Sequence, residues 1–156
     1  MSSNRHEYNS RLVWEGNKGD GTSSYETYGR QYRIAISNKP DLLGSADPQF
    51  RGDGGLHNPE DLFVAALSSC HLLSYLALCA RKKISIASYE DDAVGTMVLT
   101  PDGGGKFTEV VLHPRVKIAS GDLETAIALH ERAHHYCFIA NSVSCVVRNE
   151  PTVTRA

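Results

Sequence analysis

Apolar residues recur along the chain in short β-like stretches and in two longer runs that predict helices. The first strand is predicted over residues 10–16 (SRLVWEG), and the glycines of residues 17–21 signal a turn. Residues 22–38 have a β-rich composition with a break at Gly29. Residues 39–57 are rich in Pro, Gly, Asp and Ser and predict a long loop. Ordered loops of this length are often functional.

The longest apolar run, residues 62–80 (LFVAALSSCHLLSYLALCA), predicts a central helix that ends near residues 81–83. Its start carries an N-cap, a first-position proline and two acidic side chains (Asn58, Pro59, Glu60 and Asp61). The run is nearly long enough to span a bilayer, but its serines and histidine and the lack of a second span favour a helix buried in protein. Because it is apolar nearly all round, we expect the second half of the chain, a second subunit or both to cover it.

The second half predicts two strands over residues 84–100 and 106–118, joined by a glycine-rich hairpin. Those glycines are not a phosphate loop, because no Walker pattern accompanies them. A second helix is predicted from about Asp122 to His135, with Leu123, Ile127, His130 and His134 near one stripe, and a last strand over residues 144–153. The order predicts an α+β fold and one domain over residues 1–156, with residues 1–9 as a flexible N-terminus.

Composition narrows the class of protein. The 156 residues are 41% hydrophobic and 22% charged, with a net charge of −2, which is ordinary for a soluble globular chain. A nucleic-acid binder normally has a basic face, so we expect no nucleic-acid partner. The start, MSSNRHEYNS, lacks the apolar stretch of a signal peptide, so we expect a cytoplasmic protein without membrane contact and with reduced thiols. In that setting the tripeptide Arg51-Gly52-Asp53 is a chance match to the integrin motif.

One short motif suggests a metal. Residues 130–134 read His-Glu-Arg-Ala-His, and histidines four residues apart on a helix share a face that can hold zinc, with Glu131 as general base. A zinc protease also needs a third ligand and a substrate cleft. We therefore expect a helix with surface histidines and no metal, and keep a small zinc hydrolase using His130 and His134 as an alternative.

The four cysteines (Cys70, Cys79, Cys137 and Cys145) form a second constellation. Cys70 and Cys79 lie on opposite faces of one predicted helix at ~100° per residue, so they cannot form a disulfide. The fold could bring Cys137 to Cys70, although it lies 67 residues further along the chain. The alternative is that all four are small apolar core residues.

Three segments resemble the OsmC/Ohr family of organic hydroperoxide reductases. They are Asn58–Phe63 with the Ser68-Ser69-Cys70 that follows, residues 135–142 (HYCFIANS), and Trp14-Glu15-Gly16 in the first strand. The resemblance covers roughly residues 10–155. It implies antiparallel sheets wrapped around a central buried helix in an intertwined homodimer.

The resemblance also implies roles for individual residues. Cys70 matches the peroxidatic cysteine and Cys137 the resolving one, and Glu60 matches the family's glutamate. The family's arginine matches Arg51, with Arg30 and Arg33 as alternatives. The chain departs from the family at His71, where an aromatic residue is frequent, and at Phe138, where many members have proline.

The chemistry fits these residue types. Peroxide cleavage needs a thiolate, which burial disfavours and a nearby guanidinium favours. Attack leaves a sulfenic acid at Cys70, and Cys137 condenses with it to a disulfide. The resemblance implies an external dithiol reductant, a lipoyl protein or a small thiol, and no cofactor. Apolar walls from Leu62, Phe63, Leu67, Leu72 and Phe138 would favour alkyl or lipid hydroperoxides. The alternative within this fold is a non-catalytic protein that binds an apolar ligand or senses redox state.

The spacing of Glu60 and Cys70 predicts a shared site. Ten residues of helix separate their Cα atoms by ~15 Å, too far for one guanidinium to touch both groups. An antiparallel crossing of two copies near Ala65-Ala66 places Glu60 of one copy beside Cys70 of the other. Small residues there (Ala65, Ala66, Ser68 and Ser69) permit close approach.

Overall fold

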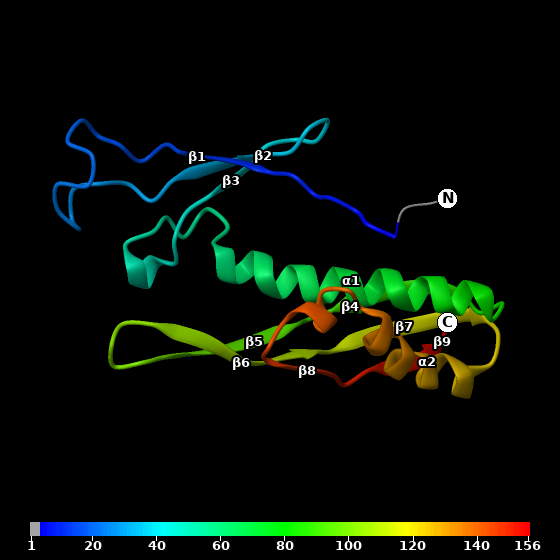
Figure 1. The fold of residues 1–156 in the computed structure, drawn as a ribbon. Coiled ribbons are helices and arrows are strands. Elements are labelled where there is room, and N and C mark those ends of the chain that lie inside the picture. Colours follow the sequence, from blue (N-terminus) through cyan, green and yellow to red (C-terminus); the bar gives the residue numbers. More distant parts are fainter. Residues whose placement is uncertain (1–3) are drawn as a thin grey trace. The chain divides into compact units, whose positions relative to one another are not determined.

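The computed structural model describes residues 4–156, which contain the helices α1 and α2, two short 3-10 helices and nine strands (Figure 1). The chain divides into two compact units, residues 1–62 and residues 63–156. Of the predicted flexible N-terminus, residues 4–9 are exposed and in no helix or strand, and the first three lie outside the described residues. The single-domain assignment stays a prediction.

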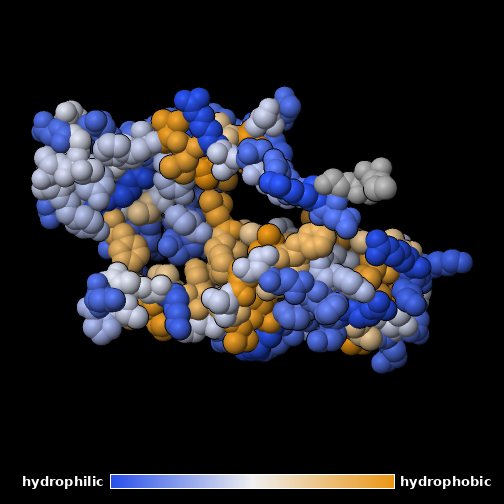
Figure 2. Space-filling model, viewed as in Figure 1, coloured by the Kyte–Doolittle hydropathy of each residue, from blue (hydrophilic) through white to orange (hydrophobic). Residues whose placement is uncertain are grey.

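The first unit holds a three-stranded antiparallel sheet of β1 (Arg11–Trp14), β2 (Tyr32–Ala35) and β3 (Leu42–Gly44), in that order. β1 lies inside its predicted range, whereas residues 22–28 form turns and bends rather than strand. The reason is local, because the Thr27 N–H and hydroxyl both donate to Ser24 O, at 3.3 and 3.1 Å, and close a turn there. Apolar side chains such as Leu12 and Leu43 stay exposed on this sheet (Figure 2).

The predicted loop of residues 39–57 contains β3 and the 3-10 helix η1 (Pro48–Phe50). Beyond it, α1 (Pro59–Arg81) begins where the sequence predicts. Asn58 Oδ1 accepts the Asp61 N–H at 2.8 Å, and the Asp61 carboxylate accepts the Asn58 N–H at 3.3 Å. This reciprocal pair satisfies amide donors that the first helical turn leaves unpaired.

The end of α1 is fixed by a left-handed residue. The Ile84 N–H donates to Cys79 O at 2.9 Å, and the Lys83 N–H donates to Ala80 O at 3.0 Å. Lys83 has a φ of 57°. This is a Schellman motif, in which glycine is the usual residue at the left-handed position. Here a lysine occupies it.

The predicted hairpin of the second unit is present, but both of its arms are broken. One arm forms β4 (Ser85–Asp91) and β5 (Val94–Leu99), and the other β6 (Gly105–Leu112) and β7 (Pro114–Ser120). β5 pairs with β6 and β4 with β7, both antiparallel. At the break, the Asp91 carboxylate accepts a hydrogen bond from the His113 N–H at 2.7 Å. Pro114 has no N–H, so it cannot donate to a neighbouring strand. Two three-stranded sheets result.

The last predicted strand is also two strands, β8 (Val146–Asn149) and β9 (Thr152–Arg155), separated at Pro151. β8 joins β6 and β9 joins β7, both in parallel. The sheets of the second unit are therefore mixed rather than purely antiparallel as expected. Only a chain that passes through α2 before returning to the sheet can pair in this direction.

α2 (Leu123–Tyr136) starts at Asp122, whose carboxylate accepts the Thr125 N–H at 2.7 Å. Its buried residues are Ala126, Leu129, His130 and Ala133. The predicted stripe was therefore partly wrong, because Ile127 is exposed and His130 is buried. The helix is rotated from the expected stripe so that small alanines allow close packing.

Helix α1 contributes one face to two core clusters of the second unit. Tyr75, Leu78 and Cys79 join β4, β7 and α2 residues in the first cluster, and Leu67 joins Val110 and Leu112 of β6 in the second. The opposite ridge remains exposed (Asp61, Ala65, Ser69, Leu73, Ala77 and Arg81). The helix is long and apolar enough to cross a membrane, a test that core helices of soluble proteins also pass.

Candidate active site

The structure brings Cys70 and Cys137 together. Cys70 lies midway along α1 and is half-buried, whereas Cys137 caps the C-terminus of α2 and is buried. The two thiols lie close enough for Cys70 to raise the pKa of Cys137. The fold thus brings together two cysteines that are 67 residues apart in the sequence. Their roles as attacking and resolving thiols stay predictions.

The surroundings of the two thiols differ. Burial raises the pKa of the Cys137 thiol well above its usual range, and the interaction with Cys70 raises it further. The Ala140 N–H donates to Cys137 Sγ at 3.4 Å, which acts in the opposite direction by favouring a sulfur anion. Cys70 is the more accessible of the pair, so it is the thiol that an incoming molecule meets first.

The other two cysteines lie elsewhere. Cys79 is fully buried beside Tyr75 in the first core cluster, and burial raises its thiol pKa. Cys145 is half-buried and packs against the second cluster. All four cysteines are free thiols, and we assign Cys79 and Cys145 to the core.

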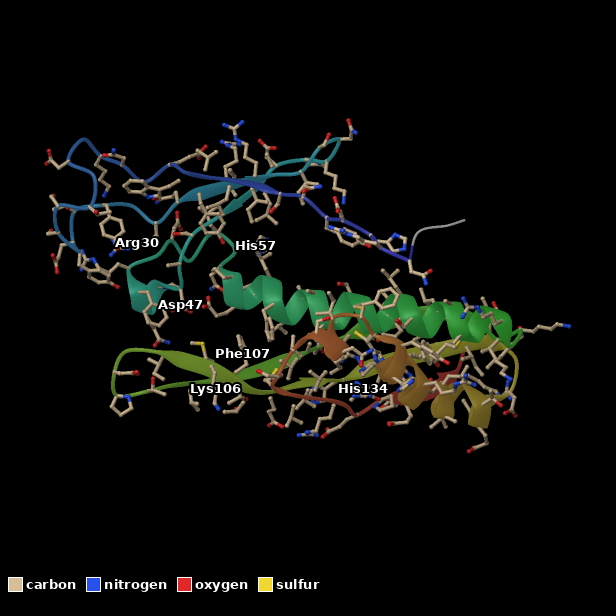
Figure 3. The ribbon with its side chains drawn as sticks, viewed as in Figure 1. Arg30, Asp47, His57, Lys106, Phe107 and His134 are labelled. Carbon is tan, nitrogen blue, oxygen red and sulfur yellow. The ribbon has the colours of Figure 1, made fainter. Side chains whose placement is uncertain are left out.

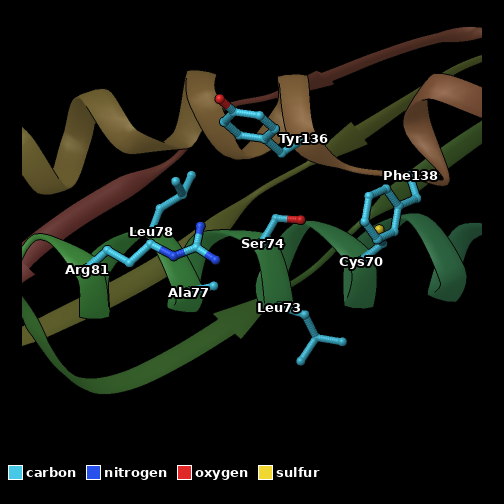
Figure 4. Close-up of a pocket in the computed structure, with 8 residues that line it drawn as sticks. All are labelled: Cys70, Leu73, Ser74, Ala77, Leu78, Arg81, Tyr136 and Phe138. Atoms are coloured by element: carbon cyan, nitrogen blue, oxygen red, sulfur yellow. The ribbon is translucent and has the colours of Figure 1, made fainter. Parts of the chain in front are cut away.

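An apolar pocket of about 350 Å³ opens beside Cys70 (Figure 4). It is formed by α1 and by the end of α2 with the residues after it: Cys70, Leu73, Ser74, Ala77, Leu78, Arg81, Tyr136 and Phe138. The five α1 residues after Cys70 follow it at intervals of three and four, so all six share one helical face. Helical periodicity counted from Cys70 identifies these five positions in the sequence.

Of the apolar walls expected from the sequence, Phe138 lines this pocket and is 79% exposed. Phe63 instead stacks on Phe107 of β6, with ring centroids 4.6 Å apart (Phe107 is labelled in Figure 3). Leu67 is completely buried against Val110 and Leu112. Leu62 and Leu72 are half-buried and are not lining residues of this pocket. Phe63 and Leu67 therefore hold α1 against the sheet, and Leu67 has no surface to offer a ligand.

A buried histidine pair joins α1 to α2. His71 Nε2 and His130 Nδ1 are 3.0 Å apart, and the His130 ring stacks on Tyr75 at 3.9 Å between centroids. Burial lowers the pKa of His71 to about 4 and that of His130 to about 3. Both rings are therefore neutral at neutral pH. The expectation of surface histidines was wrong for His130, because it occupies the face of α2 that packs on α1.

That packing also bears on the zinc motif. His130 bonds to His71 and stacks on Tyr75, while His134 is half-buried. Within residues 4–156, no group of three or more His, Cys, Asp or Glu side chains is placed to hold a metal ion. The motif thus lacks the third ligand that a catalytic zinc site requires.

Three arginines were candidates for the thiolate partner, and two of them are engaged. The Arg30 guanidinium (Arg30 is labelled in Figure 3) lies over the Tyr25 and Tyr28 rings, at 4.5 and 3.9 Å from their centroids, and donates to both backbone carbonyls. Arg33 contacts Glu15 at 2.7 Å and Asp41 at 3.1 Å. Each is held by its neighbours in the first unit.

Arg51 is different. It is exposed, caps η1 with a left-handed φ of 64°, and lines a polar pocket of about 410 Å³. Glu60 is half-buried in the first turn of α1. The structure joins Arg51 to no carboxylate, Glu60 included, in the part of the chain that it describes. Of the three arginines, Arg51 is thus the one whose guanidinium is free to act.

Comparison with known proteins identifies the family. The model of the OsmC-like protein family matches residues 52–151. The chain belongs to the OsmC-like family. An uncharacterized protein of Acinetobacter baylyi, ACIAD3023, is 33% identical over 119 residues, which are 74% of this chain and 80% of that protein.

Solved OsmC-like structures confirm the α+β fold. The OsmC-like protein of unknown function VCA0330 from Vibrio cholerae is 31% identical, with a TM-score of 0.85 over 95% of this chain and 100% of that one. An organic hydroperoxide resistance protein OsmC from Legionella pneumophila is 22% identical, with a TM-score of 0.68 over 96% and 99%. The second of these supports the fold alone.

Proposed function

We propose that this OsmC-like protein is a thiol-dependent peroxidase that reduces organic hydroperoxides. The observation that carries the proposal is a half-buried thiol, Cys70, that lines an apolar pocket and lies close to a buried second thiol, Cys137. Family membership and the hydroperoxide-resistance role named for the Legionella pneumophila structure agree with it.

The first step is attack of the Cys70 thiolate on the terminal oxygen of the hydroperoxide. The O–O bond breaks, the sulfur is oxidised to a sulfenic acid, and the substrate leaves as an alcohol after taking up a proton. Cys137 then attacks that sulfur, a disulfide forms, and the sulfenic oxygen leaves as water. The closeness of the two thiols supports this order, because Cys137 lies within interaction range of Cys70.

An external dithiol completes the cycle by thiol–disulfide exchange. Two protein thiols are regenerated and the reductant leaves as its own disulfide. We propose a dihydrolipoyl protein or a small thiol as this reductant, acting in the cytoplasm, where such thiols are kept reduced.

The pocket supports organic substrates over hydrogen peroxide. Leu73, Ala77, Leu78 and Phe138 offer apolar surface close to Cys70. Burying an alkyl chain there contributes about 0.8 kcal/mol per methylene group, which hydrogen peroxide cannot gain.

We assign Arg51 to the thiolate and Glu60 to the orientation of its guanidinium. Arg51 makes no ion pair within the described residues, which supports this choice over Arg30 and Arg33, because their guanidinium groups already have partners. A guanidinium near Cys70 would favour the thiolate and donate hydrogen bonds to the peroxide.

The site requires two copies of the chain in this proposal. α1 is one continuous helix, so Glu60 and Cys70 are ~15 Å apart along it. Near Ala65 the exposed ridge of α1 carries the small side chains of Ala65 and Ser69, the surface that a close helix crossing needs. Ser68 is not part of that ridge, because its hydroxyl bonds to Asp91 of β4. A two-fold crossing near Ala65 would place Arg51 and Glu60 of one subunit at Cys70 and Cys137 of its partner.

The proposal is tested by cysteine variants assayed with cumene hydroperoxide and hydrogen peroxide side by side, recycled by dihydrolipoamide. Cys70→Ser is expected to abolish consumption of peroxide. Cys145→Ser is the matched control because Cys145 is also half-buried, and it should retain activity. Equal activity in wild type and Cys70→Ser would overturn the proposal, and binding without turnover in wild type would identify a ligand-binding or redox-sensing protein.

The role of Cys137 in forming the disulfide is tested by mass spectrometry after one equivalent of peroxide. Wild type should give a Cys70–Cys137 disulfide within one chain. Cys137→Ser should react once and then over-oxidise at Cys70. A different disulfide, such as Cys70–Cys145, would refute the assignment of Cys137.

The shared site is tested by co-expressing Arg51→Ala with Cys70→Ser. Each parent lacks one component in both sites, whereas the heterodimer has one complete site. Isolated heterodimers should therefore recover up to about half the wild-type activity. Heterodimers as inactive as the parents, or an active wild-type monomer, would contradict the dimeric site.

A further inference from the structure

The pocket beside Cys70 has a cationic end. Arg81, the last residue of α1, is the one charged side chain among its lining residues, and in Figure 4 its guanidinium extends along α1 toward Ser74. We propose that Arg81 selects hydroperoxides that carry a carboxylate at the far end of the alkyl chain, by pairing with that carboxylate. This inference rests on the peroxidase function proposed above and adds a specificity residue to it.

The guanidinium of Arg81 lacks the partners that other arginines have. Arg33, Arg115 and Arg148 each contact two carboxylates of the chain. Over residues 4–156, Arg81 makes no such ion pair. An arginine fork matches a carboxylate with two parallel hydrogen bonds. The pocket therefore offers an unpaired cation to an anionic group of the ligand.

The spacing sets the length of the ligand. Eleven residues separate Cys70 from Arg81, which is ~16 Å along the helix axis. Helical side chains lean toward the N-terminus, so the guanidinium lies closer to Cys70 than its Cα does. An alkyl chain between the peroxide and the carboxylate spans the remaining distance. The apolar side chains of Leu73, Ala77 and Leu78 lie between the two ends.

A structural role for the same residue makes a different prediction. A cation in the last helical turn stabilises the negative end of the helix dipole, and Lys82 and Lys83 follow Arg81 directly. Lys82 does not line the pocket, so Lys82→Gln removes the same charge from the same helix end and is the matched control. A dipole role predicts the same effect for Arg81→Gln and Lys82→Gln. A role in the pocket predicts that only Arg81→Gln changes the choice of substrate.

The first test compares the hydroperoxide of linoleic acid with that of its methyl ester, which differ only in the carboxylate. Wild type and Lys82→Gln should prefer the free acid in kcat/KM, and Arg81→Gln should lower that preference about five- to tenfold. Arg81→Lys should keep part of the preference, because it keeps the charge and loses the fork. Equal use of acid and ester by wild type, or an equal loss of preference in Lys82→Gln, would overturn the inference.

The second test does not depend on peroxidase activity. Decanoate should slow alkylation of Cys70 by iodoacetamide, measured by mass spectrometry, more than decanol does, and Arg81→Gln should remove that difference. Equal protection by decanoate and decanol in wild type would refute carboxylate pairing. If wild type shows carboxylate-dependent protection and consumes no hydroperoxide, the peroxidase proposal fails and the pairing by Arg81 stands.

Discussion

The buried histidine pair should make this protein sensitive to mild acid. Burial lowers the pKa of His71 to about 4 and of His130 to about 3, from an ordinary value of 6.5. The Asp91 carboxylate of β4 raises the pKa of His71 and His134 lowers it, and His71 in turn lowers that of His130. In the unfolded chain both imidazoles bind protons at about pH 6.5, while in the folded chain they do not.

The direction in which stability changes with pH follows from proton linkage. Between the folded and unfolded pKa values the unfolded state binds more protons, so the free energy of unfolding rises with pH. The stabilisation is complete above pH 6.5 and is lost as the pH falls toward 4. Between pH 8 and pH 5 each histidine should lower the free energy of unfolding by about 2 kcal/mol, so the pair should lower it by about 4 kcal/mol.

The measurement is urea unfolding followed by circular dichroism at intervals from pH 8 to pH 5. The double variant His71→Leu/His130→Phe removes both titrating rings and the hydrogen bond between them, and should flatten most of the pH dependence. His135→Gln is the matched control, because His135 lies on the same helix and is exposed. A wild-type unfolding free energy that is constant between pH 7 and pH 5, or a double variant with the wild-type slope, would refute this reasoning.

Three further changes should alter the free energy of unfolding, measured by the same denaturation at pH 7. Asn58→Ala removes the cap that accepts the Asp61 N–H and should destabilise the protein by about 1 kcal/mol, and a loss below experimental error would contradict the cap. Lys83→Gly relieves a left-handed lysine and should stabilise the protein by about 1 kcal/mol, so any destabilisation would contradict the strain. Leu67→Ala empties a fully buried site and should destabilise by about 3 kcal/mol, whereas Leu73→Ala, at a 66% exposed position on the same helix, should have a much smaller effect.

Local sequence signals predicted the element boundaries best where a few neighbouring residues satisfy the backbone. The start of α1 at Asn58 and that of α2 at Asp122 are such cases, because each cap bonds to an amide three residues on. The breaks in the hairpin arms were missed. They depend on Asp91 meeting His113 across the sheet, a contact between residues 22 positions apart.

The sequence likewise predicted some features of the candidate site and not others. The sequence indicated both thiols by motif, and the order of elements with the family resemblance indicated the fold class. It could not show that Leu67 faces the sheet while Leu73 faces the pocket, since α1 is apolar on nearly every side. When a helix has no polar face, its own pattern does not specify which side is buried.

The sequence by itself determined where the helices begin, which residues carry thiols, and the family. The tertiary structure decided that Cys70 meets Cys137, that His130 is buried against His71 rather than exposed beside a metal, and that Arg81 lies at the end of the pocket. The physical reason is the range of the interactions. Caps and helical periodicity act within a few residues, whereas burial and the pKa of a side chain depend on which element packs against it from elsewhere in the chain.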